Sequence, residues 1–129
     1  MNLFSAQTEE SFSYLISDYG FSKPEAEDGN WKTTFLYVKD LIGIEVELNY
    51  DNMDTYVYIM SLENKKQVTE YDNNPPVRRN LEALLGIEPS IKNGDSITID
   101  QFEKGIKYKS ELLKKNLDQM LNNTKKVFV

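Results

Sequence analysis

The stretch LIGIEVELNYDNMDTYVYIMSLE, residues 41–63, holds two segments on either side of a short polar break: residues 42–50 alternate between apolar and polar side chains, and residues 55–62 are mostly β-branched or aromatic. A period of two is typical of β-strands, because successive side chains point to opposite faces of a sheet. The break, DNMD at residues 51–54, is short enough to join two antiparallel strands as a hairpin. We therefore predict strands over residues 42–50 and 55–62.

The same reasoning extends the sheet in both directions along the chain. Residues 31–38 are rich in threonine and aromatic side chains, which favour strands, and Lys39-Asp40 is a short connector to the next strand. A fourth short strand is predicted near residues 68–71. The expected sheet is a three- to four-stranded antiparallel meander.

A helix is predicted ahead of the sheet. Thr8 is a suitable N-cap, Gly20 is a suitable C-terminal stop, and residues 22–30 are predicted to form a polar loop. Between the two ends of this helix, the spacing of four side chains places them on one helical face: Phe12, Leu15, Ile16 and Tyr19.

Two further helices are predicted after the sheet. Pro75 and Pro76 suit the first turn of a short helix over 77–85, and turns are expected over 90–99. Asp100 with Glu103 is typical of a capping box that begins a long C-terminal helix. The apolar stripe of that helix is Phe102, Ile106, Leu113, Leu117 and Met120, widened by Leu112 and Leu121. The chain of 129 residues is thus expected to be a single α+β domain over 1–129.

The predicted hairpins divide the strand residues between two faces. Turns centred on Lys39-Asp40 and on Asn52-Met53 would place Phe35 opposite Ile44 and Val46 opposite Ile59. One face then forms the core, covered by the first helix. Its members are Trp31, Phe35, Tyr37, Ile42, Ile44, Val46, Leu48, Val57 and Ile59.

The opposite face combines apolar, aromatic and acidic side chains. It carries Leu36, Val38, Glu45, Glu47, Tyr56, Tyr58, Met60 and Leu62. The C-terminal helix, a second copy of the chain or a foreign protein could each cover it. Tyrosines beside carboxylates are typical of recognition surfaces, whereas Glu45 and Glu47 as an acid–base pair are less expected than a solvated strand face. The predicted partner-binding residues are Glu45, Glu47, Tyr56, Tyr58 and Met60.

Composition argues against most catalytic chemistries. The chain has no cysteine and no histidine, which removes the thiolate nucleophile, the usual general base near neutral pH and the commonest metal ligands. Asp54 with Glu63-Asn64-Lys65 faintly resembles the Asp…Glu-x-Lys pattern of metal-dependent nucleases, but such a short pattern is common by chance. We expect no enzymatic activity, no cofactor and no metal site.

The charge of the chain is acidic and unevenly distributed. The formal net charge is −6; residues 1–75 hold 14 acidic and 5 basic side chains, and residues 76–129 hold 7 acidic and 10 basic. An acidic chain disfavours nucleic-acid binding. Neither a signal peptide nor an apolar run long enough to span a membrane is evident, so we expect a cytoplasmic protein that does not bind membranes.

The motif Phe12-x-x-Leu15-x-x-x-Tyr19-Gly20-Phe21, followed by the meander over 31–62, resembles a loose group of small bacterial proteins. These proteins open with a helix that ends in an aromatic-Gly-Phe turn and continue into an antiparallel sheet. Some of them are immunity proteins that neutralise a toxin, and many are uncharacterised. The resemblance covers residues 12 to about 63, and it assigns no functional residue.

From these patterns we expect a non-enzymatic protein-binding protein. The most specific hypothesis is an immunity-type protein or inhibitor that masks a basic partner, such as a toxin, through its acidic, tyrosine-containing sheet face. One alternative is a homodimeric structural or adaptor protein whose sheet face is its own interface. A second alternative is a metal-dependent hydrolase that uses carboxylates alone.

Overall fold

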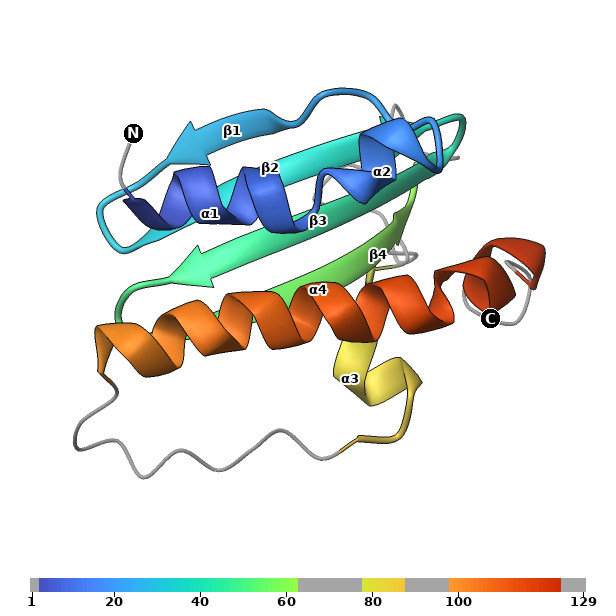
Figure 1. The fold of residues 1–129 in the computed structure, drawn as a ribbon. Helices are drawn as coiled ribbons and strands as arrows, with labels where there is room; N and C mark the ends of the chain where they lie inside the picture. The colour runs from blue at the N-terminus through green and yellow to red at the C-terminus, as the bar shows by residue number, and fades with distance from the viewer. Residues whose placement is uncertain (1–2, 63–77, 88–97, 124–129) are drawn as a thin grey trace, which may run out of the picture.

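The computed structural model describes residues 3–62, 78–87 and 98–123, which form an α+β fold (Figure 1). Five antiparallel strands make one sheet in the order β1-β2-β3-β4-β5. The predicted α+β class and meander are confirmed, and the sheet is wider than the three or four strands expected. The elements are α1 (Leu3–Ser11), α2 (Tyr14–Ser17), β1 (Glu25–Asp28), β2 (Lys32–Lys39), β3 (Ile42–Asn49), β4 (Asp54–Ser61), β5 (Arg78–Asn80), α3 (Leu81–Leu84) and α4 (Ile99–Asn122).

The pairing of the central strands differs from the prediction by two residues. Phe35 lies opposite Val46, not Ile44, and Ile59 lies opposite Ile44, not Val46. The first turn is centred one residue later than predicted, with Asp40 in a left-handed conformation (φ 54°), and the second is centred one residue earlier. Since side chains alternate with a period of two, a shift of two residues leaves each side chain on its predicted face.

Helices α1, α2 and α4 all pack on the same face of the sheet, with α1 and α4 side by side (Figure 1). The prediction that α1 covers the core face is confirmed, whereas α4 as the cover of the opposite face is wrong. Trp31 is also wrong as a core residue, because it precedes β2 and is 51% exposed. The buried core comprises Phe12, Tyr14, Leu15, Phe21, Phe35, Tyr37, Ile44, Val46, Leu48, Val57, Ile59, Leu81, Phe102, Ile106, Leu113, Leu117 and Met120.

The N-terminal helix begins earlier than predicted and is broken in two. Thr8 is not an N-cap: it is buried within α1, and its hydroxyl donates a hydrogen bond to the carbonyl of Phe4 at 2.7 Å. The break between α1 and α2 leaves Ile16 exposed rather than in the core. The stop at Gly20 is confirmed, since its φ of 77° lets the Phe21 amide donate back to the Leu15 carbonyl at 2.8 Å.

Two short segments differ from the predicted elements. Within the expected loop at 22–30, Glu25–Asp28 forms the edge strand β1, paired with β2. The helix expected over 77–85 is shorter: Arg78–Asn80 forms β5, and α3 begins only after Asn80, whose side chain caps it by accepting from the Ala83 amide. The expected strand at 68–71, the prolines at 75–76 and most of the expected turns at 90–99 lie outside the described residues.

The long helix α4 begins two residues before the predicted capping box. Thr98 is the N-cap, and Gln101 completes a reciprocal capping box in place of Asp100 and Glu103. The predicted apolar stripe is confirmed, because all five of its members are buried: Phe102, Ile106, Leu113, Leu117 and Met120.

Candidate functional site

The predicted partner-binding residues lie together on the sheet face opposite the α1–α4 layer. Glu45 of β3 is directly opposite Tyr58 of β4, and Glu47 is directly opposite Tyr56. These two Glu–Tyr pairs are successive same-face positions of the same two strands, so they have the same orientation. The structure thus forms two copies of one side-chain arrangement.

The first Glu–Tyr pair is already occupied by a cation of the same chain. The guanidinium of Arg78, on β5, forms an ion pair with Glu45, and its central carbon lies 3.6 Å from the ring centroid of Tyr58. Arg78 therefore uses both members of the pair, through charge on one and the ring face on the other. Sequence reasoning missed this residue because it was assigned to a helix instead of the strand that borders β4.

The second Glu–Tyr pair is more loosely contacted. Glu47 is only 7% exposed, so its prediction as a solvated carboxylate is wrong. Its nearest described cation is the Lys32 ammonium at 3.8 Å, and the Asn49 side-chain amide lies 3.4 Å away. Both distances are at the long end for polar contacts, so this buried carboxylate is weakly neutralised.

Tyr56 is half-buried and has its own set of neighbours. Its hydroxyl accepts a hydrogen bond from the Asn52 side-chain amide at 2.7 Å. The ammonium of Lys109 lies 5.8 Å from the ring centroid, but that ammonium forms a buried ion pair with Glu82 of α3. The rings of Tyr56 and Tyr58 are 6.4 Å apart and inclined at 35°, so they form adjacent platforms.

Both tyrosines have raised pKa values. Burial is the main cause of the raised pKa at Tyr56; the hydrogen bond from Asn52 opposes it, and the carboxylates of Asp54, Glu47 and Glu82 raise the pKa further. Burial likewise raises the pKa of Tyr58, and the nearby Arg78 opposes this effect. Each hydroxyl therefore stays protonated and neutral across the physiological pH range, able to donate a hydrogen bond.

Two glutamates that sequence reasoning missed extend the same face onto β1. Glu25 is paired with Leu36, which is paired with Glu45, so all three side chains share one face. Glu27 is likewise connected through Thr34 to Glu47. A signal was present in the sequence, since Glu25-Ala-Glu27 repeats the Glu-x-Glu alternation of β3. We call this surface the acidic face and define it as Glu25, Glu27, Glu45, Glu47, Tyr56, Tyr58 and Met60.

One end of the acidic face is apolar. Met60 is half-buried and pairs with Gly43, which in turn pairs with Val38. A methyl group at Gly43 would lie 3.3 Å from a side-chain carbon of Leu36 and 3.5 Å from one of Leu62. Glycine at this position thus leaves room for the side chains of Leu36 and Leu62 to pack over β3, beside the Glu–Tyr pairs.

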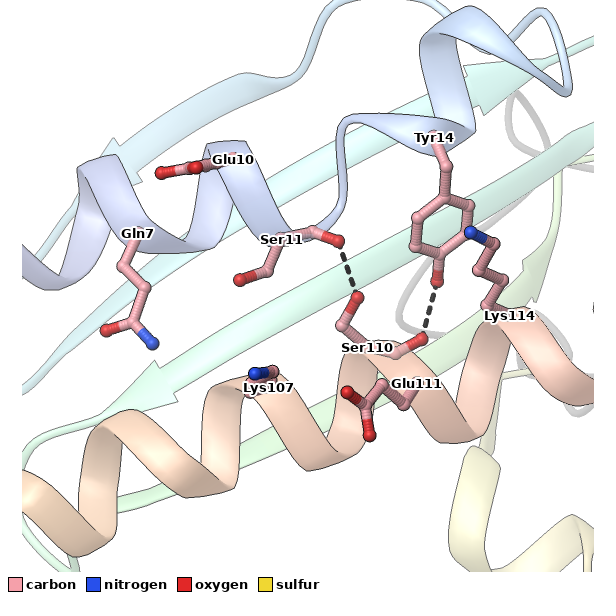
Figure 2. A pocket seen from close by; sticks show the side chains of 8 residues that line it. All are labelled: Gln7, Glu10, Ser11, Tyr14, Lys107, Ser110, Glu111 and Lys114. Atoms are coloured by element: carbon pink, nitrogen blue, oxygen red, sulfur yellow. Dashed lines mark hydrogen bonds between the residues drawn. The ribbon is translucent and has the colours of Figure 1, made fainter.

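A separate polar groove of about 430 Å³ lies between α1–α2 and α4 (Figure 2). Within it, the Tyr14 hydroxyl donates to the Ser110 carbonyl at 2.8 Å, and the Ser110 hydroxyl donates to the Ser11 carbonyl at 2.5 Å. These bonds join the helices, and the charged side chains around them have mixed signs, so the groove is a helix–helix seam. Its lining is Gln7, Glu10, Ser11, Tyr14, Lys107, Ser110, Glu111 and Lys114.

Two further features would bear on function in the described residues: a cluster of metal-ligating side chains and a helix able to cross a membrane. Over 3–62, 78–87 and 98–123, no three acidic side chains gather closely enough to hold a metal ion. Within those same ranges, no helix has the length and apolar character needed to cross a membrane. Comparison with known proteins gives no match to any family model, curated protein or solved structure.

Proposed function

We propose that this chain is a non-enzymatic binding protein that recognises a basic protein through the acidic face. The observation that carries the proposal is the pair of cross-strand Glu–Tyr arrangements on one face of the sheet. Helices α1, α2 and α4 pack on the other face (Figure 1). Both tyrosines are half-buried, so each ring keeps accessible area while its backbone is fixed in a strand. Such rings bind with little further loss of side-chain entropy.

The charge of the acidic face indicates the class of partner. The face carries four glutamates, two on β1 and two on β3; Lys32 contacts Glu47 and Arg78 pairs with Glu45, which leaves an excess of negative charge. Such an excess attracts a basic surface and raises its rate of association, with a clear loss at high salt. An inhibitor of a basic toxin, as the resemblance to immunity proteins implies, meets this requirement.

Self-association through the same face is less favourable. A two-fold symmetric dimer places the same patch on both sides of its interface. The glutamates of one copy would then approach those of the other, which opposes association. The homodimer alternative therefore receives less support from the charge distribution than a basic foreign partner does.

Affinity capture with two charge-matched variants tests this proposal. Glu25→Lys with Glu27→Lys reverses charge on the acidic face, where both residues are exposed. Glu10→Lys with Glu111→Lys makes the same change in net charge at the helix seam, where both residues are also exposed. The proposal predicts that a basic protein from an extract of the encoding cells binds the unmodified chain and the seam variant, but not the acidic-face variant.

The captured protein is then purified and mixed with the unmodified chain. Hydrogen exchange should slow in β3 and β4, and raising the salt concentration should weaken the complex. Equal loss of binding in both variants would mean that only net charge matters. Protection confined to another surface would refute the acidic face as the binding site.

A further inference from the structure

Arg78 shows which chemical group the Glu–Tyr arrangement accepts. Its guanidinium lies over the ring of Tyr58, with its central carbon 3.6 Å from the centroid, and is ion-paired with Glu45. The side chain reaches this position from β5, where Arg78 is opposite Met60, one same-face position along the strand from Tyr58. A planar cation stacked on a ring and held at its edge by a carboxylate is a geometry that arginine satisfies better than lysine.

The second Glu–Tyr arrangement has the same framework but no arginine of its own among the described residues. Glu47 and Tyr56 occupy the next same-face positions of β3 and β4, in the same register. Strand β5 pairs only with residues 58–60 of β4, and the chain turns into α3 after Asn80. Arg78 starts opposite Met60 and reaches Tyr58, so the equivalent starting position for Tyr56 is the one opposite Tyr58. That position is occupied by Asn80, a short uncharged side chain that caps α3.

The charges around this second arrangement favour an added cation. Glu47 is nine-tenths buried, and its contacts to Lys32 and to the Asn49 amide are long, at 3.8 and 3.4 Å. Lys109, the other nearby cation, is buried and ion-paired with Glu82, and it lies 5.8 Å from the Tyr56 centroid. Neither lysine reproduces the close stacking that Arg78 makes on Tyr58.

We propose that the Glu47–Tyr56 pair binds an arginine side chain of the partner, in the way that the Glu45–Tyr58 pair binds Arg78. This inference rests on the proposed function, because the arginine is supplied by the basic protein. The partner's guanidinium stacks on the exposed part of the Tyr56 ring and donates hydrogen bonds to the Glu47 carboxylate. The Lys32 ammonium, whose side chain is 40% exposed, moves toward solvent as the guanidinium enters.

Titration of the ¹⁵N-labelled protein with single amino-acid amides tests the inference without the partner. The probes are N-acetyl-arginine amide and N-acetyl-lysine amide at low salt, read by amide chemical shifts in β3 and β4. We expect the arginine probe to shift residues 47 and 56 and to bind about two- to five-fold more tightly than the lysine probe, the range for one exposed cation–π contact. Glu47→Gln should abolish this response.

Arg78→Ala provides the matched control, because it vacates the first arrangement. In this variant the arginine probe should also shift residues 45 and 58, and Glu45→Gln added to it should remove that second response alone. Equal binding of the two probes, or no response at 47 and 56 in the unmodified protein, would overturn the inference. If Arg78→Ala does not fold, the unmodified protein and Glu47→Gln still decide the result.

Failure of this inference differs from failure of the proposed function. If the captured basic protein protects β3 and β4 but retains its affinity when its arginines are replaced by lysines, the acidic face stands and the arginine assignment fails. If capture is insensitive to the acidic-face variant, the proposed function fails whatever the amide titration shows.

Discussion

The buried ion pair between Lys109 of α4 and Glu82 of α3 gives a sharp test of the packing. The two side chains are 6% and 7% exposed, so neither charge is well solvated. Replacing Lys109 by methionine keeps most of its aliphatic stem and leaves the Glu82 carboxylate buried without its partner. Breaking a buried pair in this way costs about 3–5 kcal/mol of unfolding free energy.

Removing both charges should cost far less than removing one. In Lys109→Met with Glu82→Leu, no charge is left buried, and replacement of a buried pair by apolar groups is often neutral or stabilising. We therefore expect the double variant to be within about 1 kcal/mol of the unmodified protein or more stable, although each single variant is strongly destabilised. The coupling free energy between the two positions should be several kcal/mol.

Urea denaturation of the four proteins in this cycle measures the effect. With a slope of about 2 kcal/mol per M, a loss of about 4 kcal/mol lowers the midpoint by about 2 M. Lys104→Met is the control: its ion pair with Asp100 is solvated, with side chains 78% and 77% exposed, and the change should stay within about 0.5 kcal/mol. Single-variant costs that simply add in the double variant would refute the reasoning.

Three other predictions follow from burial and backbone geometry. Ile44→Ala should lower the unfolding free energy by about 2–5 kcal/mol in chemical denaturation, because Ile44 is fully buried. Trp31→Ala should lower it by less than about 1 kcal/mol, because Trp31 is half-exposed. Similar losses in the two variants would contradict the assigned faces. Gly20→Ala should cost about 1 kcal/mol through its positive φ alone, since an added methyl group there meets no atom within 4 Å; a neutral change would contradict the helix-stop geometry. Burial raises the pKa of Tyr14 and Tyr37 above the ordinary value of 10.0. The stability that depends on their neutral forms is therefore present below about pH 10 and is lost as the pH rises further. A series of denaturation midpoints that stays flat above about pH 10 would refute this.

The division of the sheet into two faces could be predicted from the sequence, because face depends only on whether a position is odd or even. The predicted turn centres at Lys39-Asp40 and Asn52-Met53 were each displaced by one residue, which moves the pairing by two and preserves the faces. Exact register could not be predicted, since it depends on the turn geometry, including positive φ values at Asp40 and Met53 that these side chains adopt only in context.

The elements that sequence reasoning missed are those with no hydrophobic pattern of their own. Strand β1 consists of exposed Glu-Ala-Glu-Asp, and it forms because the edge of β2 offers unpaired backbone groups. Strand β5 has only three residues, Arg-Arg-Asn, and its pairing with β4 is non-local. The missed members of the acidic face, Glu25 and Glu27, and the cation that occupies it, Arg78, come from these two strands.

The hydrogen bonds across the helix seam have a consequence for the order of folding. The Tyr14–Ser110 and Ser110–Ser11 bonds join residues 96 and 99 positions apart, whereas the hairpins of β2, β3 and β4 join near neighbours in the chain. Closing a long loop costs more entropy than closing a hairpin, so we expect the meander to form first and α4 to dock late. During synthesis on the ribosome, the part of the meander's apolar side that α4 covers therefore stays open to water, and to chaperones, until α4 has been made.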